Sequence, residues 1–308
     1  MTEPLFDTIA VIGLGLIGSS VARGVKSRGL ARLIVGYDVS EEVRARSSEL
    51  GFCDDVAATP EAAAAGADLI VVAVPVGATA KAVEAIAAHL KEGAIVTEVG
   101  SVKAAVIRQV LAVLPAHASF VPGHPIAGTE HSGPDAGFAE LFDGRWCILT
   151  PCERSTDEAV AKVTALWRGL GSAVEIMTPE HHDIVLAITS HIPHLIAYNI
   201  VGTASDLEQV TSSEVIKFSA GGFRDFTRIA SSDPVMWRDV FLNNKPAVLE
   251  VLGRFTEDLS ALQRMIRWDD GEALLELFTR TRAIRRGIIE AGQDTPEADF
   301  GRPHGHEE

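Results

Sequence analysis

Cysteine is scarce in this chain, and so are the features of secreted and membrane proteins. Its three cysteines, Cys53, Cys147 and Cys152, lack both the paired spacing of a disulfide framework and the spacing of a metal site. They predict a reducing, cytoplasmic environment. The N-terminus carries Glu3 and Asp7 instead of the basic residues of a signal peptide. No uninterrupted apolar run reaches the roughly 18 residues of a membrane-spanning helix, so we expect no membrane segment.

Positive charge is also in short supply. The 308 residues include 27 lysines and arginines against 42 acidic residues, a net charge of −15. No basic face is evident, which argues against nucleic acid or an anionic membrane as a partner. An anionic substrate would need local cations against this acidic background. The 47% of hydrophobic residues are ample for a real core and suggest two domains.

The hydrophobic pattern predicts an α/β protein with a second, all-α domain. Residues 1–178 alternate short β-branched runs with alanine-rich helical stretches, which is typical of a mostly parallel, Rossmann-type sheet covered on both faces. Residues 179–292 read as helices only, and the polar, proline-containing tail 293–308 is expected to be disordered. The strands are expected at 8–12, 33–37, 69–74, 95–99, 119–121, 146–150 and 174–176. The later helices are expected at 179–205, 206–218, 234–243, 246–267 and 270–291.

A glycine pattern opens the first domain. Gly13, Gly15 and Gly18 form G-x-G-x-x-G directly after an expected strand, before a helix that begins with Leu16 and Ile17. In that context the three glycines allow a tight turn, close approach of a pyrophosphate, and close packing of helix on strand. The free N–H groups of the helix N-terminus then face the phosphates. The pattern predicts a dinucleotide cofactor.

Three further residues are expected around this cofactor. Asp38 lies at the end of the second strand, where a carboxylate accepts hydrogen bonds from the adenosine ribose and repels a 2′-phosphate. We therefore expect NAD, with NADP less favoured. Val74 and Pro75 follow another strand, at the carboxyl edge of the sheet where the cofactor should lie.

Two residues are candidates for chemistry near the nicotinamide. His124 lies between Gly123 and Pro125, in what we expect to be a loop, and has no obvious packing role there. A neutral imidazole can take the proton of a hydroxyl as hydride leaves the same carbon. Ser101 follows another strand and would sit beside the cofactor crevice; capping the next helix is an equal possibility for it.

The helical region carries histidines and arginines at helical spacing. His191 and His194 share one face of a helix that Pro193 should kink. Arg224 and Arg228 are four residues apart after a flexible Gly-Gly turn, a pattern that favours carboxylate recognition. Solvated or salt-bridged arginines are the alternative. Metal binding is disfavoured at 191–194, because the His-x-x-His run lacks the glutamate of a zinc-protease helix. It is also disfavoured at 181–183. The alternative for His191 and His194 is that they are core histidines satisfied by hydrogen bonds.

Six segments carry a resemblance to a known family: GLGLIGSS at 13–20, EVGSVK at 98–103, HPIAGTEHSG at 124–133, TSHIPH at 189–194, GGFRDFTRIA at 221–230 and SDPVMWRD at 232–239. Taken together, they resemble the prephenate/arogenate (cyclohexadienyl) dehydrogenase family. The resemblance covers about residues 7–291, and HPIAG together with GGFRDFTRIA is close to diagnostic. Position 98 is Glu where members of the family often have Asp, and the absence of a preceding mutase segment suggests the monofunctional form.

The resemblance implies NAD-dependent oxidative decarboxylation of a cyclohexadienyl substrate, prephenate or arogenate, in tyrosine biosynthesis. It implies that His124 takes the ring hydroxyl proton with help from Ser101. Arg228 would bind a substrate carboxylate, with Arg224 and His194 lining the pocket. It further implies a homodimer through the helical domain and inhibition by tyrosine at the active site. Substrate-pocket or gating positions are implied for Thr129, Glu130 and Trp237.

Two other functions fit part of the pattern. A β-hydroxyacid dehydrogenase or imine reductase also joins a Rossmann domain to a helical dimer domain. The hydroxyacid members use a catalytic lysine early in the second domain, but this chain has no lysine between Lys162 and Lys217. A non-catalytic NAD-binding regulator would keep the glycines and Asp38, yet would not need His124, His194 and Arg228 together. The dehydrogenase is therefore the function we predict.

Overall fold

The chain folds into two compact units in the computed structural model. The structure describes residues 3–129, 131–206, 214, 217–218 and 221–290. The first unit comprises residues Met1–His194 and Ser231–Val248, and the second comprises Leu195–Ala230 and Leu249–Glu308. The boundary that the sequence predicts at residue 178 follows the end of the sheet, whereas the first compact unit continues into the helices beyond it.

An eight-stranded sheet forms the centre of the first unit, in the order β3-β2-β1-β4-β5-β6-β7-β8. All neighbouring strands are parallel except β6 and β7, which are antiparallel. This confirms the predicted Rossmann-type, mostly parallel architecture. The strands are β1 (Phe6–Ile12), β2 (Ala31–Tyr37), β3 (Asp55–Val56), β4 (Leu69–Val72), β5 (Ile95–Glu98), β6 (Ser119–Pro125), β7 (Trp146–Leu149) and β8 (Ala173–Ile176).

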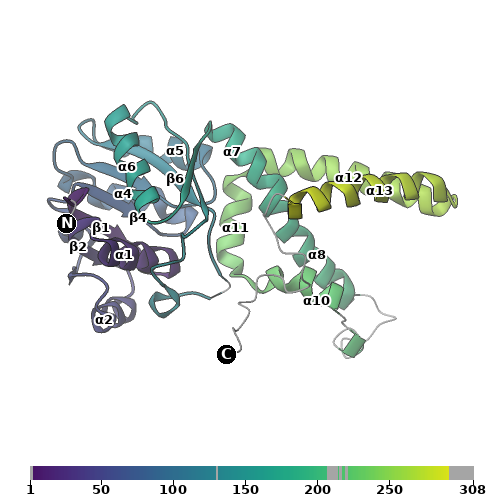
Figure 1. Cartoon of the computed structure of the whole chain (residues 1–308), viewed down its shortest axis with the longest axis horizontal. Helices are drawn as coiled ribbons and strands as arrows, with labels where there is room; N and C mark the ends of the chain where they lie inside the picture. The colour runs from purple at the N-terminus through teal and green to yellow at the C-terminus, as the bar shows by residue number, and fades with distance from the viewer. Residues whose placement is uncertain (1–2, 130, 207–213, 215–216, 219–220, 291–308) are drawn as a thin grey trace. The chain divides into compact units, whose positions relative to one another are not determined.

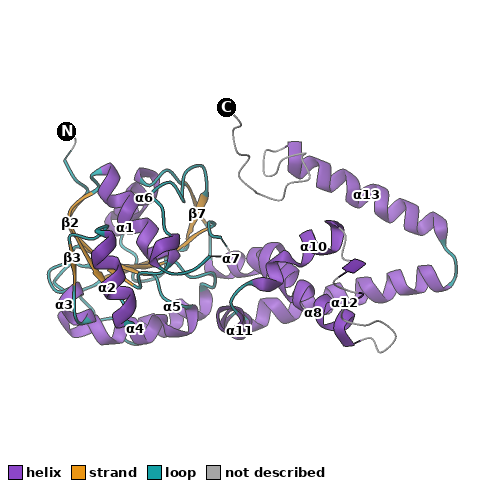
Figure 2. Ribbon diagram, turned by 90° about the horizontal axis from the view of Figure 1, so that it is seen from below, coloured by secondary structure: helices purple, strands orange, loops and turns teal. Residues whose placement is uncertain are grey.

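Helices cover both faces of this sheet, so its central strands are buried on both sides. All four residues of β4 are buried, as a parallel strand between two helical layers must be. Figure 2 shows α1 and α6 on one face and α3, α4 and α5 on the other. Trp167 of α6 packs edge-on against Phe142 in the core between α6 and the sheet. The helices are α1 (Leu16–Arg28), α2 (Glu41–Leu50), α3 (Pro60–Ala64), α4 (Thr79–Ile86), α5 (Ala104–Leu111) and α6 (Asp157–Gly169), with short 3₁₀ turns η1 (Val76–Ala78), η2 (Ala87–His89) and η3 (Pro134–Ala136).

Strand β6 is longer than the sequence predicts, and the expected loop around His124 is wrong. Residues 119–122 pair with β5, and residues 123–125 pair with β7, where His124 lies opposite Ile148. The glycine and proline that flank His124 indicated a loop. Both residues are accommodated in β6, because the strand stops pairing with β5 and starts pairing with β7 at this point. His124 therefore lies on the sheet, at the carboxyl end of a central strand.

Helices follow the sheet. They are α7 (Pro179–Leu186), the π-helical turn η4 (Ala187–His191), α8 (Ile192–Asp206), α10 (Gly221–Thr227), the 3₁₀ turn η5 (Arg228–Ser231), α11 (Pro234–Asn243), α12 (Lys245–Arg267) and α13 (Gly271–Glu290). Of those described, α7 and α11 belong wholly to the first unit, and α8 and α12 belong to it in part. The helix predicted at 206–218 falls mostly outside the described residues. The kink expected at Pro193 takes the form of the π turn, because proline lacks the N–H that would bond to Thr189.

Helix α11 packs against the cofactor side of the sheet domain. A Cβ on Gly77, in η1 after β4, would come within 2.6 Å of the Asp239 carboxylate of α11. Gln109 of α5 donates to Asn243 at the end of α11. These contacts are why residues 231–248 belong to the first unit.

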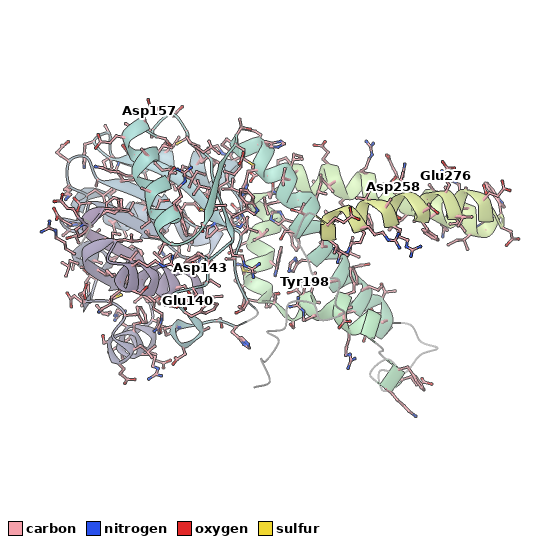
Figure 3. All side chains as sticks on the ribbon, viewed as in Figure 1. Glu140, Asp143, Asp157, Tyr198, Asp258 and Glu276 are labelled. Atoms are coloured by element: carbon pink, nitrogen blue, oxygen red, sulfur yellow. The ribbon has the colours of Figure 1, made fainter. Side chains whose placement is uncertain are left out.

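The second unit leaves much apolar surface uncovered. No residue of the 20-residue helix α13 is buried. Helices α12 and α13 form a hairpin (Figure 1) and diverge when viewed from below (Figure 2). Asp258 and Glu276, labelled in Figure 3, are exposed polar residues of these two helices. Exposed large apolar side chains of the hairpin include Leu249, Leu259, Ile266, Trp268, Leu275, Phe278, Ile284 and Ile288.

One helical run has the length and composition of a membrane span, which the sequence prediction missed. Residues Pro179–Asp206 contain an 18-residue window with a mean hydropathy of 1.5, 28% of which is buried. A core helix of a soluble protein meets the same criterion. The run also carries His182, Asp183 and His191, which are buried and hydrogen-bonded inside the first unit.

Candidate active site

The glycine turn between β1 and α1 has the geometry of a dinucleotide cradle. Gly13 has φ of +96°, and a Cβ there would lie 2.4 Å from the carbonyl oxygen of Ala73. A Cβ on Gly18 would lie 1.9 Å from the carbonyl oxygen of Gly13. A Cβ on Gly15 would meet nothing within 4 Å, and no side chain caps the helix at Gly15. Open space therefore faces the uncapped N-terminus of α1, where a pyrophosphate fits.

Asp38 is held at the rim of this cradle. Its carboxylate accepts hydrogen bonds from the backbone N–H of Leu14 and of Ser40, each at 2.9 Å. These two bonds tie the end of β2 to the glycine turn and orient the carboxylate. Val74 and Pro75 follow β4, and Val74 lies within 3.0 Å of the Cβ position at Gly13. The predicted cofactor residues thus meet at one edge of the sheet.

A buried ion pair lies beneath His124. Lys103 and Glu98 are both fully buried and bonded to each other. The Lys103 ammonium also donates to the carbonyl oxygen of Gly123 at 2.6 Å, and Glu98 accepts from the N–H of Gly100. Burial raises the pKa of Glu98 and lowers the pKa of Lys103, and their mutual attraction opposes both shifts. The pair fixes the backbone on which His124 sits.

His124 is a partly buried, neutral imidazole. Burial lowers its pKa well below 6.5, and His182, Lys103 and His191 add to the effect. Its Nδ1 lies 2.9 Å from Nε2 of His182, and Nδ1 of His182 lies 2.9 Å from the Asp183 carboxylate. An imidazole that stays neutral at pH 7 keeps a lone pair available for a proton.

Asp183 joins α7 to α5. Its two carboxylate oxygens accept the backbone N–H groups of Lys103 and Ala104, at 2.8 and 3.0 Å. Lys103 is the N-cap of α5 and Ala104 is its first residue, so the alternative that Ser101 caps this helix is wrong. Ser101 lies between β5 and α5, at the same sheet edge as His124.

His191 and His194 lie on either side of Trp237. Trp237 stacks on His194 with ring centroids 3.7 Å apart and meets His191 edge-on at 6.0 Å. Asn244 donates to the carbonyl oxygen of Asp183 and to Nδ1 of His191, so His191 carries its proton on Nε2. Burial lowers the pKa of His191 to about 4. Within the described residues, neither His191 Nε2 nor Trp237 Nε1 has a hydrogen-bond partner.

Of the remaining predicted residues, Arg224 and Arg228 belong to the second unit, whereas Thr129 belongs to the first. Arg224 in α10 and Arg228 in η5 are exposed residues of the second unit, so Arg228 lies just past the helix that was expected to carry both. Thr129 is exposed and accepts from the N–H of His131. Glu130 falls outside the described residues.

Four residues of the site were not predicted from the sequence: His182, Asp183, Lys103 and Asn244. The run 181–183 was noticed, but only as a metal-binding candidate. Throughout the described residues, no group of three His, Cys, Asp or Glu side chains could hold a metal ion. Asp183 caps a helix and holds His182. Lys103 was visible as the last residue of EVGSVK, yet only the fold shows that it is buried against Glu98.

A glycine cradle at a helix N-terminus, with a neutral histidine at the carboxyl end of β6 in the same sheet, defines a dinucleotide-dependent oxidoreductase. The prephenate dehydrogenase nucleotide-binding domain matches residues 21–176, and the prephenate dehydrogenase dimerization domain matches residues 178–280. The chain belongs to the prephenate dehydrogenase family.

Individual relatives agree with this assignment. The cyclohexadienyl dehydrogenase of Zymomonas mobilis is 44% identical over 92% of this chain and 97% of its own length. The prephenate dehydrogenase of Bacillus subtilis is 35% identical over 92% of this chain and 76% of its own. The crystal structure of prephenate dehydrogenase from Aquifex aeolicus, in complex with hydroxyphenyl propionate and NAD⁺, has a TM-score of 0.85 at 33% identity, over 94% of this chain and 99% of that chain.

The glycine cradle makes a testable distinction between two alanine substitutions. Gly18→Ala forces a methyl group into the Gly13 carbonyl and should destabilise the protein by about 1–3 kcal/mol. Gly15→Ala meets open space, so its unfolding free energy should change by less than about 0.5 kcal/mol. Its methyl group occupies the pyrophosphate position, so its NAD affinity should fall. Denaturant unfolding and NAD titration measure the two effects. Intact NAD binding by Gly15→Ala would contradict the assignment of the cradle.

The buried ion pair predicts strong coupling between two substitutions. Lys103→Met leaves Glu98 buried without its partner and should cost about 3–5 kcal/mol of unfolding free energy. Adding Glu98→Gln removes the unpaired charge and should restore part of that loss. A double-mutant cycle by chemical denaturation measures the coupling. Additive effects of the two changes would show that the charges do not depend on each other.

Proposed function

We propose that this protein catalyses the NAD-dependent oxidative decarboxylation of prephenate or arogenate. The carrying observation is the neutral His124, which lies at the carboxyl end of β6 in the sheet that carries the dinucleotide cradle, in a chain of the prephenate dehydrogenase family. Its relatives are named cyclohexadienyl, prephenate and arogenate dehydrogenases. The family assignment removes the β-hydroxyacid dehydrogenase and the non-catalytic regulator as alternatives. The product is 4-hydroxyphenylpyruvate or tyrosine.

The residues of the site divide the chemistry as follows. NAD, when bound, supplies the hydride acceptor. His124 accepts the proton of the ring hydroxyl, at the carbon that loses hydride, and Ser101 assists at the same hydroxyl. The ring carboxylate leaves as CO₂, and its bonding electrons make the ring aromatic. The resulting phenolate oxygen takes the proton back from the His124 imidazolium, which restores the neutral base. The low pKa of His124 keeps the acceptor unprotonated before each turnover.

Substrate recognition is assigned to cations and polar groups of the helical region. Arg228 binds a substrate carboxylate, and Arg224 and His194 line the pocket. A guanidinium holds a carboxylate through two parallel hydrogen bonds, and positive groups are scarce in a chain with a net charge of −15. Thr129, Glu130 and Trp237 contribute to the pocket or its gating. Tyrosine, as a product-like ligand of the same groups, inhibits at this site.

The assignment of His124 predicts a specific loss of chemistry. His124→Asn removes the proton acceptor, so kcat should fall by about 10²–10⁴-fold while NAD affinity changes little. In the wild type, the rate should fall as the pH drops through the pKa of His124, and this limb should lie below pH 6.5 because burial lowers that pKa. Steady-state kinetics with prephenate, arogenate and a hydroxyacid panel make the test. An unchanged kcat for His124→Asn under hydride-limited conditions would refute the assignment.

Asp38 predicts a preference for NAD over NADP. A carboxylate at the ribose accepts hydrogen bonds from its hydroxyls and repels a 2′-phosphate, so the ratio of kcat/KM should exceed about tenfold. Asp38→Asn removes the charge at constant size and should narrow the ratio, mainly by lowering KM for NADP. Unfolding measured on the same variant controls for the bonds to Leu14 and Ser40. Equal use of both cofactors by the wild type would show that Asp38 does not face the ribose.

We also propose a cytoplasmic homodimer. The dimerization-domain match and the uncovered apolar side chains of α12 and α13 support the dimer. The three cysteines are free, in keeping with a reducing compartment. Arg224 and Arg228, which we assign to the substrate, belong to this same helical region.

The dimer proposal predicts where association can be disrupted. Replacing both Leu275 and Phe278, which are 69% and 56% exposed, with glutamate should weaken the dimer. The exposed Glu276→Gln on the same helix is the matched control and should leave the mass unchanged. Light scattering at micromolar concentration reports the mass. A wild-type monomer would overturn the proposal.

A further inference from the structure

We propose that His182, held by Asp183, positions His124 by fixing which of its ring nitrogens carries the proton. His124 would be protonated on Nδ1, which leaves the Nε2 lone pair as the proton acceptor. The inference rests on the proposed role of His124. It adds two residues, His182 and Asp183, that act through His124 and touch neither substrate nor cofactor.

The chain of contacts runs through three side chains. His124 Nδ1 and His182 Nε2 are 2.9 Å apart, and His182 Nδ1 and the Asp183 carboxylate are 2.9 Å apart. The two rings meet edge to face, with centroids 5.1 Å apart and planes at 66°. His182 is fully buried and Asp183 is 5% exposed, so solvent does not compete for these bonds.

Asp183 determines which ring nitrogen of His182 carries the proton. Both of its carboxylate oxygens already accept backbone N–H groups, from Lys103 and Ala104, so the group acts here as an acceptor. The nitrogen that faces it, His182 Nδ1, must then be the donor. This leaves Nε2 of a neutral His182 without a hydrogen.

The position of the proton on His182 in turn determines which ring nitrogen of His124 is protonated. A bare Nε2 on His182 accepts only from a protonated Nδ1 on His124. The alternative is a doubly protonated His182, and burial opposes it because burial lowers the pKa of His182. Lys103 also opposes a charge there, and Asp183 favours it. The same burial, with Lys103, His182 and His191 nearby, keeps His124 neutral.

The arrangement matches what the proposed step requires. When Nε2 of His124 takes the substrate proton, the ring becomes an imidazolium whose Nδ1–H still donates to His182. No proton needs to move along the chain. The partner bonded to one imidazole nitrogen sets both the tautomer and the ring orientation at the other. Without that partner the ring is free to rotate and to carry its proton on Nε2, where it cannot act as a base.

Two substitutions at position 182 separate positioning from packing. The amide of glutamine reaches the place of Nε2, so His182→Gln keeps an acceptor for His124 and loses the bond to Asp183. The amide of asparagine reaches only the place of Nδ1, so His182→Asn keeps the hydrogen bond to Asp183 and loses the hydrogen bond to His124. The proposal expects kcat to fall by about 10²-fold in His182→Asn and to stay within about tenfold of wild type in His182→Gln, with KM little changed in both. His181→Asn, at the exposed neighbouring histidine, is the control.

The tautomer itself is measured by ¹⁵N NMR of histidine-labelled protein without ligands. Wild type and His182→Gln should show His124 protonated on Nδ1, whereas His182→Asn should shift it toward Nε2. A reversed ranking of the two variants, or a wild-type His124 protonated on Nε2, would overturn the proposal. Because the spectrum needs no turnover, it stands apart from the role of His124: if His124→Asn were fully active, the proposed function would fail while the tautomer result remained readable.

Discussion

The carboxylate of Asp183 is the interaction on which the site depends. It caps the N-terminus of α5, it holds His182, and the backbone carbonyl of the same residue accepts from Asn244. One residue thus connects the sheet domain, α7 and the junction of α11 and α12. Because an acceptor buried among backbone N–H groups cannot exchange its partners for water, the side chains bound to it have a single arrangement.

The buried groups on the two sides of His124 differ in charge. Beneath it, Lys103 and Glu98 remain buried because they are bonded to each other and to backbone groups. Beside it, burial outweighs the attraction of Asp183, lowers the pKa values of His182 and His191 and keeps both rings neutral. The same desolvation cost explains both results: Lys103 and Glu98 stay charged because each is paired, whereas the two histidines stay neutral. The result is a rigid backbone under a neutral imidazole.

The second unit has a different physical character. Its long helices bury almost nothing within one chain, so packing in the described monomer cannot account for their apolar side chains. The same helical region holds Arg224 and Arg228, the cations assigned to the substrate. Association and recognition are therefore assigned to one region, whereas the glycine cradle and His124 belong to the sheet domain.

Much of this organisation could be predicted from the sequence. Continuous apolar strands between helical stretches predicted the parallel sheet, and Gly13, Gly15 and Gly18 predicted the cradle, because their steric requirements are local. Aspartate just before a helical stretch favours an N-cap for the same local reason, and the Asp270 carboxylate accepts from the N–H of Ala273. Motif order was also sufficient to identify the family, since the matching segments are spread over nearly the whole chain.

Other features depended on contacts between residues far apart in the chain. His124 was expected in a loop, because a glycine and a proline give no sign that β7 will pair beside it. His182 lies 58 residues from His124 and Asp183 lies 80 residues from Lys103, so no local pattern joins them. The sequence by itself determined the fold class, the cofactor cradle and the family. Only the tertiary structure decided which buried groups are paired and which nitrogen of His124 faces His182, because hydrogen bonding and desolvation are properties of neighbours in space.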